Sequence, residues 1–147
     1  MKTLELIFYT LLAMFLWYAV AFGEPLVVSP ILPNNVMTPG DVIPDVTREK
    51  ICLSGYTGSV RNVSSKTRTS VFVMYYIDPM KDRYEVDHLI SLELGGSNDI
   101  KNLWPQSYTV FIWNARAKDE LENKMHKLIC LGLLDLPTAQ FEIATDW

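Results

Sequence analysis

The sequence predicts an α+β fold in which two short strands precede an amphipathic helix. Residues 84–94 alternate apolar and polar side chains well enough for a strand with one buried face. A Gly-Gly turn at 95–96 follows, and the apolar run 102–104 suits a partner strand that ends at Pro105. Residues 113–131 then carry apolar side chains at steps of three and four, which is the pattern of a helix with one buried face.

The chain begins with a segment typical of export. Residues 6–23 are apolar and uncharged, follow Lys2, and end in small residues that suit cleavage. We interpret residues 1–23 as a secretory signal peptide. An uncleaved membrane anchor is the alternative, because a stretch of 18 apolar residues can just span a bilayer. In both cases we expect the rest of the chain to leave the cytoplasm, as a secreted or periplasmic protein.

A proline-rich arm is predicted over residues 24–47, ahead of a single domain over residues 48–147. The arm contains five prolines, which remove backbone donors and favour extended or turn conformations, so it is a linker or a wrapping arm. Inside the domain, residues 65–77 leave two alternatives open. Their β-branched and aromatic side chains favour a strand, whereas the Ser/Thr-rich start is typical of a helix N-terminus.

The end of the chain predicts a second helix packed as a helical hairpin. Gly132 suits the end of the amphipathic helix, because glycine readily adopts the left-handed conformation that closes a helix. Asp135 then offers an N-cap, and Pro137 suits the first turn of a last short helix through Ala144.

The chain contains two cysteines, Cys52 and Cys130. In an exported chain an even pair predicts a disulfide, which over so long a loop would stabilise the fold by about 4 kcal/mol. Two free buried thiols are the alternative. A zinc site formed by His126 with Cys130, four residues apart on one helix, is a third possibility that would forfeit the disulfide. Otherwise we interpret His126 as a packing or surface residue.

Composition excludes several classes of protein. The net charge of −4 argues against a protein that coats nucleic acid non-specifically. Two histidines and two cysteines are too few for a zinc ribbon, a tris-histidine metal site or a disulfide-dense mini-protein.

The central segment resembles the HNH endonuclease motif, the ββα-metal fold. The resemblance lies in YEVDHLISLELGGSNDIKNLWPQSY, residues 84–108, and in WNARAKDELENKMHKLIC, residues 113–130. The matching parts are Asp-His on the first strand, the Gly-Gly-Ser-Asn loop, Asn-Leu on the second strand, and Asn-x-x-x-Lys on the helix. More loosely, residues 38–63 and 139–147 are similar to small exported bacterial proteins that carry this motif.

The resemblance implies a role for each matched residue. His88 is the general base, since its ordinary pKa lies near the working pH. Asp87 and Asn114 hold one divalent metal, with Mg²⁺ or Mn²⁺ favoured because the ligands are oxygens. Asn102 fixes the loop between the strands and so aims His88. Neighbours in a strand point to opposite faces, so the resemblance implies a bulge or strand end at Asp87 and His88.

Two helix residues, Lys118 and Arg116, are weaker candidates for phosphate contact, with a solvated helix face as the alternative for each. Lys124 and the cluster of Arg61, Lys66 and Arg68 are further basic candidates of the same kind. Ser91 departs from the proline of many HNH motifs, and Asn114 stands where others have histidine.

The function that this sequence predicts is an exported, metal-dependent endonuclease acting on DNA, with RNA left open. The alternative is a catalytically silent exported binding or structural protein on the same fold. A toxin with a dedicated immunity protein as partner would use the same chemistry. Contact with a membrane is expected only if the N-terminal segment stays uncleaved.

Overall fold

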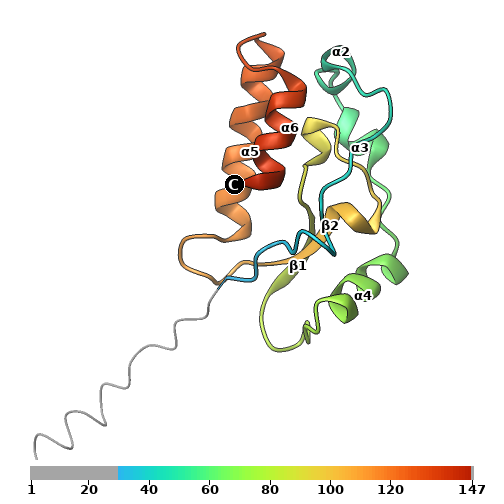
Figure 1. Cartoon of the computed structure of the whole chain (residues 1–147), viewed down its shortest axis with the longest axis vertical. Coiled ribbons are helices and arrows are strands. Elements are labelled where there is room, and N and C mark those ends of the chain that lie inside the picture. Colours follow the sequence, from blue (N-terminus) through green and yellow to red (C-terminus); the bar gives the residue numbers. More distant parts are fainter. Residues whose placement is uncertain (1–29, 147) are drawn as a thin grey trace, which may run out of the picture.

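A computed structural model describes residues 30–146 (Figure 1). The predicted signal peptide, residues 1–23, lies outside the described residues, as does the start of the arm. Between residues 30 and 146 none of the helices has both the length and the apolar character needed to cross a membrane.

The predicted α+β class is confirmed: a two-stranded antiparallel hairpin is combined with helices, and a pair of helices ends the chain. The elements in order are α2 (Arg48–Ile51), α3 (Tyr56–Val60), α4 (Ser65–Met74), β1 (Tyr84–His88), the 3-10 turns η1 (Leu92–Leu94) and η2 (Ile100–Asn102), β2 (Leu103–Ser107), α5 (Ala115–Cys130) and α6 (Leu136–Thr145).

Of the two alternatives for residues 65–77, the structure has the helix, α4. The Ser64 side chain accepts a hydrogen bond of 3.0 Å from the backbone N–H of Thr67, which caps the N-terminus. Val71 is fully buried in a small core with Val86 and Leu103 of the hairpin. A cap and one packed face therefore outweigh the strand propensity of this segment.

Strand β1 is shorter than predicted, ending at His88 instead of residue 94. The backbone N–H and C=O of Ile90, which would continue the strand, are both bound by the side chain of Asn102. Residues 92–94 form a 3-10 turn instead. The strand end that the resemblance implied at Asp87 and His88 is therefore present.

The expectation that Pro105 ends the second strand is wrong, because β2 continues to Ser107. Pro105 lies opposite Val86 in the ladder. In an antiparallel hairpin, hydrogen-bonded residue pairs alternate with non-hydrogen-bonded pairs. The bond from Leu89 N to Asn102 O shows that Leu89 and Asn102 form a hydrogen-bonded pair, so every second pair along the ladder from there is hydrogen-bonded. Pro105 falls in a non-bonded pair, where its missing N–H faces away from β1 and costs no ladder bond.

The helical hairpin of α5 and α6 forms as predicted, with the two helices side by side in Figure 1. Asn114 caps the start of α5, Asp135 caps α6, and Gly132 between them has a positive φ of 73°. The main core gathers apolar side chains of this hairpin with those of α2 and of the loop after β1: Ile51, Ile90, Leu94, Met125, Ile129, Leu136, Ala139 and Ile143.

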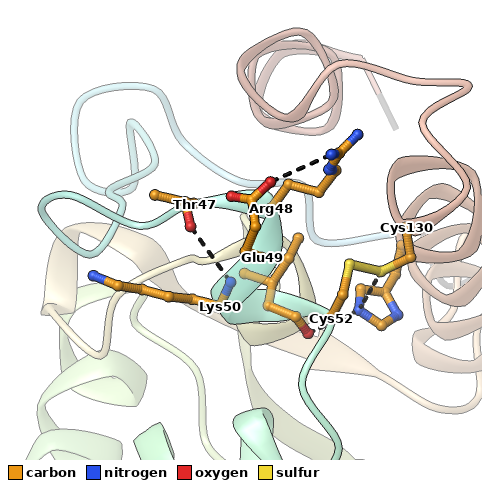
Figure 2. Close-up of a disulfide and its surroundings, with 8 residues drawn as sticks. Thr47, Arg48, Glu49, Lys50, Cys52 and Cys130 are labelled. Carbon is orange, nitrogen blue, oxygen red and sulfur yellow. Dashed lines mark hydrogen bonds and ion pairs between the residues drawn. A yellow bond between two sulfur atoms is a disulfide. The ribbon is translucent and has the colours of Figure 1, made fainter.

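The predicted disulfide between Cys52 and Cys130 is present (Figure 2). It joins the C-cap of α2 to the last residue of α5 across a sequence separation of 78 residues. The ring that it closes contains the whole β1–β2 hairpin, whereas α6 lies outside it.

The described part of the arm wraps the molecule. It pairs with the loop between the strands through backbone bonds from Gly40 N to Lys101 O (3.1 Å), from Ile43 N to Gly95 O (2.9 Å) and from Ser97 N to Asp41 O (2.9 Å). These bonds hold the loop from outside and so help to fix the side chains that it presents.

Candidate functional site

Asp87 and His88 are the last two residues of strand β1, and their side chains make contacts on two different sides of the hairpin. Asp87 points to helix α5, where Lys118 Nζ lies 2.8 Å from its Oδ2. His88 makes its hydrogen bond with Asn98, a residue of the loop that is held against the end of α3. The candidate site is therefore built around the end of one strand, with a carboxylate on one side and an imidazole on the other.

The His88 imidazole is buried, with 3% of the residue exposed. Its Nε2 lies 3.2 Å from Asn98 Oδ1, and the Asn98 amide nitrogen donates to Val60 O at 2.8 Å. Since Asn98 thus presents its oxygen to the ring, Nε2 carries the proton and Nδ1 is the basic nitrogen. Burial lowers the pKa of His88, although the bond with Asn98 opposes this shift. The ring is accordingly neutral near pH 7, as a general base requires.

Arg61 lies close to this histidine. It follows α3, and the next backbone N–H, that of Asn62, donates to Asn98 Oδ1 at 3.1 Å. Burial is the main cause of the lowered pKa of His88, and the positive charge of Arg61 adds to it. Arg61 is exposed, so its guanidinium is accessible to an anion from solvent.

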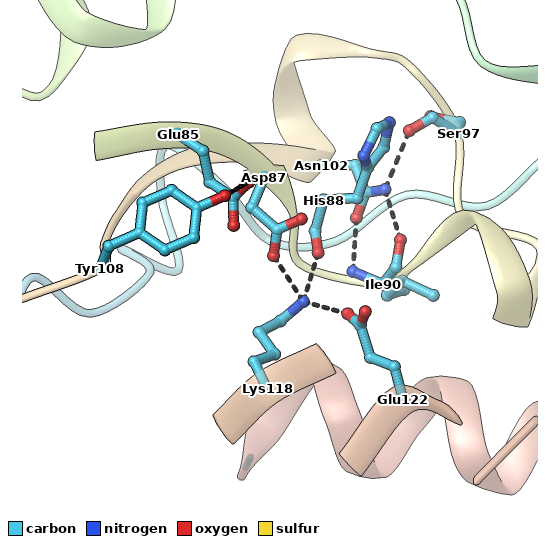
Figure 3. A network of polar contacts seen from close by, with 9 residues as sticks. All are labelled: Glu85, Asp87, His88, Ile90, Ser97, Asn102, Tyr108, Lys118 and Glu122. Atoms are coloured by element: carbon cyan, nitrogen blue, oxygen red, sulfur yellow. Dashed lines mark hydrogen bonds and ion pairs between the residues drawn. The ribbon is translucent and has the colours of Figure 1, made fainter. Parts of the chain in front are cut away.

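Lys118 is the centre of a buried polar network (Figure 3). The residue is fully buried, and its ammonium donates to Asp87, to the backbone carbonyl of His88 at 2.6 Å and to Glu122 one turn further along α5. An ammonium has three hydrogens, and these three oxygens use them all. The structure therefore gives Lys118 a structural role in place of the suggested phosphate contact.

Four carboxylates gather around this ammonium: Glu85, Asp87, Asp119 and Glu122. Burial raises the pKa of Glu85 and of Asp119, and the negative charge of Asp87 raises both further. Glu85 also accepts a hydrogen bond from the Tyr108 hydroxyl, which raises the pKa of Tyr108 to about 12. The α5 side of the strand end is thus negative and repels a phosphodiester unless a cation is added.

The raised pKa of the buried Glu122 carboxyl group is expected to make the free energy of unfolding depend on pH. Burial raises its pKa from 4.5 to about 8, against the opposing charge of Lys118. The folded state then holds a proton that the unfolded chain has released, so this contribution to the free energy of unfolding is complete below pH 4.5 and falls as pH rises to about 8. We expect Glu122→Gln to flatten that decline in urea denaturation at a series of pH values.

Glu120→Gln is the matched control, because Glu120 is exposed on the same helix. It should leave the decline in stability unchanged. An equally steep decline in Glu122→Gln would show that the proton is bound elsewhere.

Asn102 organises the loop between the strands, as the resemblance implied. Its side chain is fully buried, and its Oδ1 accepts from Ile90 N at 2.9 Å and from Asp41 N at 3.3 Å. Its Nδ2 donates to Ile90 O and to Ser97 O, each at 2.9 Å. Gly96 lies against the same turn, and a Cβ there would come within 1.7 Å of Ile90 O, so only glycine fits. The loop that carries Asn98 to His88 depends on this packing.

We expect Asn102→Ala to lower the free energy of unfolding by roughly 2–3 kcal/mol, because it leaves buried backbone groups of Ile90 and Ser97 without their partner. Asn123→Ala is the control on the exposed face of α5 and should change stability by less than about 0.5 kcal/mol. Urea denaturation of both variants measures the difference. Equal stabilities would contradict the role given to Asn102.

Asn114 has a different arrangement from the one that the resemblance implied. Its Oδ1 accepts from the backbone N–H groups of Arg116 (3.0 Å) and Ala117 (3.1 Å), and its Nδ2 donates to Val110 O at 2.9 Å. Both lone pairs of the amide oxygen therefore cap helix α5, and as placed Asn114 does not fit a metal ion. Arg116 is exposed on the first turn of α5, where contact with a phosphate stays a prediction.

Asp87 does fit a hard cation. Mg²⁺ is commonly bound by one or two carboxylates, the remaining positions being taken by water and substrate phosphate. The Asp87 side chain is 18% exposed, and Lys118 binds its Oδ2. On the same face of the hairpin, the fully buried Gln106 has no hydrogen-bond partner for either amide atom within residues 30–146. An amide oxygen beside carboxylates is a donor of the kind that such an ion takes.

Sequence reasoning missed three contributors: Asn98 as the partner of His88, the placement of Arg61, and Glu122. The Lys118–Glu122 spacing of four on a predicted helix was a usable signal for the last. Asn98 and Arg61 meet His88 only through the folded loops, which no local pattern reports. No family model, curated protein or solved structure matched this chain in the comparisons.

Proposed function

We propose that this chain is an exported endonuclease that hydrolyses phosphodiester bonds, with DNA as the favoured substrate. The observation that carries the proposal is the buried, neutral His88 with its proton fixed on Nε2 by Asn98, with the exposed Arg61 near the ring and the Asp87 carboxylate on the other side of the same strand end. The Cys52–Cys130 disulfide supports export, because such bonds persist in oxidising compartments.

Each of these groups has one task in the proposed reaction. His88 Nδ1 accepts a proton from the attacking water, and Asn98 holds the ring so that Nδ1 stays basic. The Arg61 guanidinium binds a phosphate oxygen next to the imidazole. Lys118 fixes both the Asp87 carboxylate and the His88 carbonyl, and thereby sets the distance between the two sides of the strand end.

The proposal includes one divalent ion, Mg²⁺ or Mn²⁺, held by Asp87 and its water ligands. When bound, this ion supplies positive charge to the phosphate and the leaving oxygen. The surrounding carboxylates support this part of the proposal, since without added cations they would repel the substrate.

We expect purified protein to nick supercoiled plasmid in the presence of Mg²⁺ or Mn²⁺, and to lose this activity in EDTA. Asp87→Asn should lose most of the metal-dependent rate, whereas Glu120→Gln should retain it. Gel electrophoresis of the plasmid measures both effects. Absence of nicking in every metal would overturn the nuclease proposal, and undiminished nicking in EDTA would overturn its metal requirement.

One observation favours the second candidate, a catalytically silent exported protein on the same fold. The ammonium of Lys118 already supplies a cation to Asp87. Calorimetric titration with Mn²⁺ separates the two: uptake that Asp87→Asn removes supports the nuclease, and no uptake supports the silent protein.

A further inference from the structure

A second group of metal-ligating side chains lies at the opposite end of α5 from the start that Asn114 caps. Cys52 at the C-cap of α2, His126 and Cys130 place a ligand atom each within 4.8 Å of one another. In the oxidised protein the two sulfurs form the disulfide, and His126 Nε2 lies 3.1 Å from the backbone oxygen of Ile51. The imidazole thus stands beside the sulfur–sulfur bond, with its nitrogen directed at that end of α2.

We propose that, when this disulfide is reduced, Cys52, His126 and Cys130 form a binding site for zinc. The site keeps α2 attached to α5 through a metal ion in place of the covalent bond. It lies apart from the candidate nuclease site and stands independently of the proposed function.

The existing distance between the imidazole and one sulfur favours this ion. His126 Nε2 lies 3.5 Å from Cys130 Sγ. In tetrahedral zinc sites, bonds of about 2.3 Å to sulfur and about 2.05 Å to nitrogen put these two ligands about 3.6 Å apart. Residues four apart on a helix share one face, so His126 and Cys130 reach the ion without a change in α5.

The third ligand is Cys52, the other cysteine of the disulfide. Cys52 lies at the C-cap of α2 and Cys130 at the end of α5, so the backbone already holds the two residues close together. After reduction, only the Cys52 side chain has to rotate, so that the two sulfurs reach the separation of two ligands on one zinc ion. Two thiolates and one imidazole are a ligand set that zinc takes in proteins, and a water molecule completes four-coordination.

A phosphine reductant attacks the disulfide, loses two electrons and takes the oxygen of one water molecule, while the two protons of that water pass to the sulfurs. Zn²⁺ then replaces both thiol protons, which leave to solvent. Nε2 of His126, which faces a carbonyl oxygen in the oxidised protein, binds the ion with the ring proton on Nδ1.

The test is zinc titration of the whole chain, first oxidised and then reduced with a phosphine that does not itself bind the metal. We expect one equivalent to bind to the reduced protein and none to the oxidised protein, measured by competition with a chromophoric chelator. Co²⁺ in place of zinc should give the absorption bands of a tetrahedral ion with thiolate ligands. A reduced protein that takes up no zinc would overturn the proposal.

His126→Ala distinguishes the three-ligand site from a bare pair of thiols. We expect His126→Ala to bind zinc at least about tenfold more weakly. Removing a residue that only hydrogen-bonds to a metal ligand already lowers metal affinity by about tenfold or more, and His126 is itself a ligand in the proposed site. Lys127→Ala, an exposed neighbour, should bind as the parent does. Equal affinities of His126→Ala and the parent would contradict the role of the imidazole.

A loss of structure on reduction would not obscure the result. Circular dichroism then follows the titration: recovery of helix with one equivalent of zinc supports the site, and a signal that zinc leaves unchanged speaks against it.

Discussion

Lys118→Met should lower the free energy of unfolding by about 3–5 kcal/mol, which is the usual effect of removing one partner from a buried ion pair. The side chain is fully buried, and its ammonium is shared by Asp87, Glu122 and the His88 carbonyl. Methionine fills much of the same volume, so the loss comes from charge and hydrogen bonds more than from a cavity. Chemical denaturation near pH 7 is the measurement.

Two further variants separate this effect from a general sensitivity of α5. Arg116→Met, a basic residue exposed two positions earlier, should change stability by less than about 0.5 kcal/mol. Lys118→Met/Glu122→Leu removes one of the carboxylates left behind and should recover part of the loss. If the double variant were no more stable than Lys118→Met, the buried Glu122 side chain left without its partner would not be the cause.

His88→Ala should lower the rate of DNA cleavage by roughly 10²–10⁴-fold, which is the range for loss of a general base. The residue is buried at the end of β1, with Nε2 engaged by Asn98 and Nδ1 left to accept the proton. The rate of the parent protein should rise with pH and level off below the ordinary pKa of histidine, because burial lowers the pKa of this ring. Plasmid-nicking rates across pH give both results.

A purely structural role of His88 predicts a different outcome. Added imidazole should restore part of the activity of His88→Ala if the missing group is a base, and should have no effect if the variant has lost its fold. Circular dichroism of the variant provides the second measure. A folded variant that cleaves at the parental rate would rule out His88 as the base.

Features that depend on nearby residues in the chain were predictable. The start of α6 at Asp135, its separation from α5 at Gly132 and the amphipathic face of α5 all follow from side chains a few positions apart. The disulfide was also predicted, from the compartment that the N-terminal segment indicates. In each case the physical cause is contained in a short window of sequence or in composition.

Features that depend on contacts between distant segments could not be predicted from the sequence. The early end of β1 results from Asn102, whose amide takes the backbone groups of Ile90. A lysine on an amphipathic helix is normally solvated, and Lys118 is buried because Asp87, 31 positions earlier, meets it there. Asn114 had a helix-capping role available beside the metal-binding role, and in the structure its amide oxygen accepts from the backbone N–H groups of Arg116 and Ala117.

The covalent ring closed by Cys52 and Cys130 also determines what a protease can do to this protein. The exposed loop that joins β2 to α5 carries Phe111 and Trp113, 95% and 49% exposed, and lies inside the ring. Exposed loops are where proteases cut folded chains. A single cut there opens the ring yet leaves the two pieces joined through the disulfide and through the packing of α5. The nicked molecule would therefore stay one covalent unit under oxidising conditions, and reduction would leave its two fragments joined by packing alone.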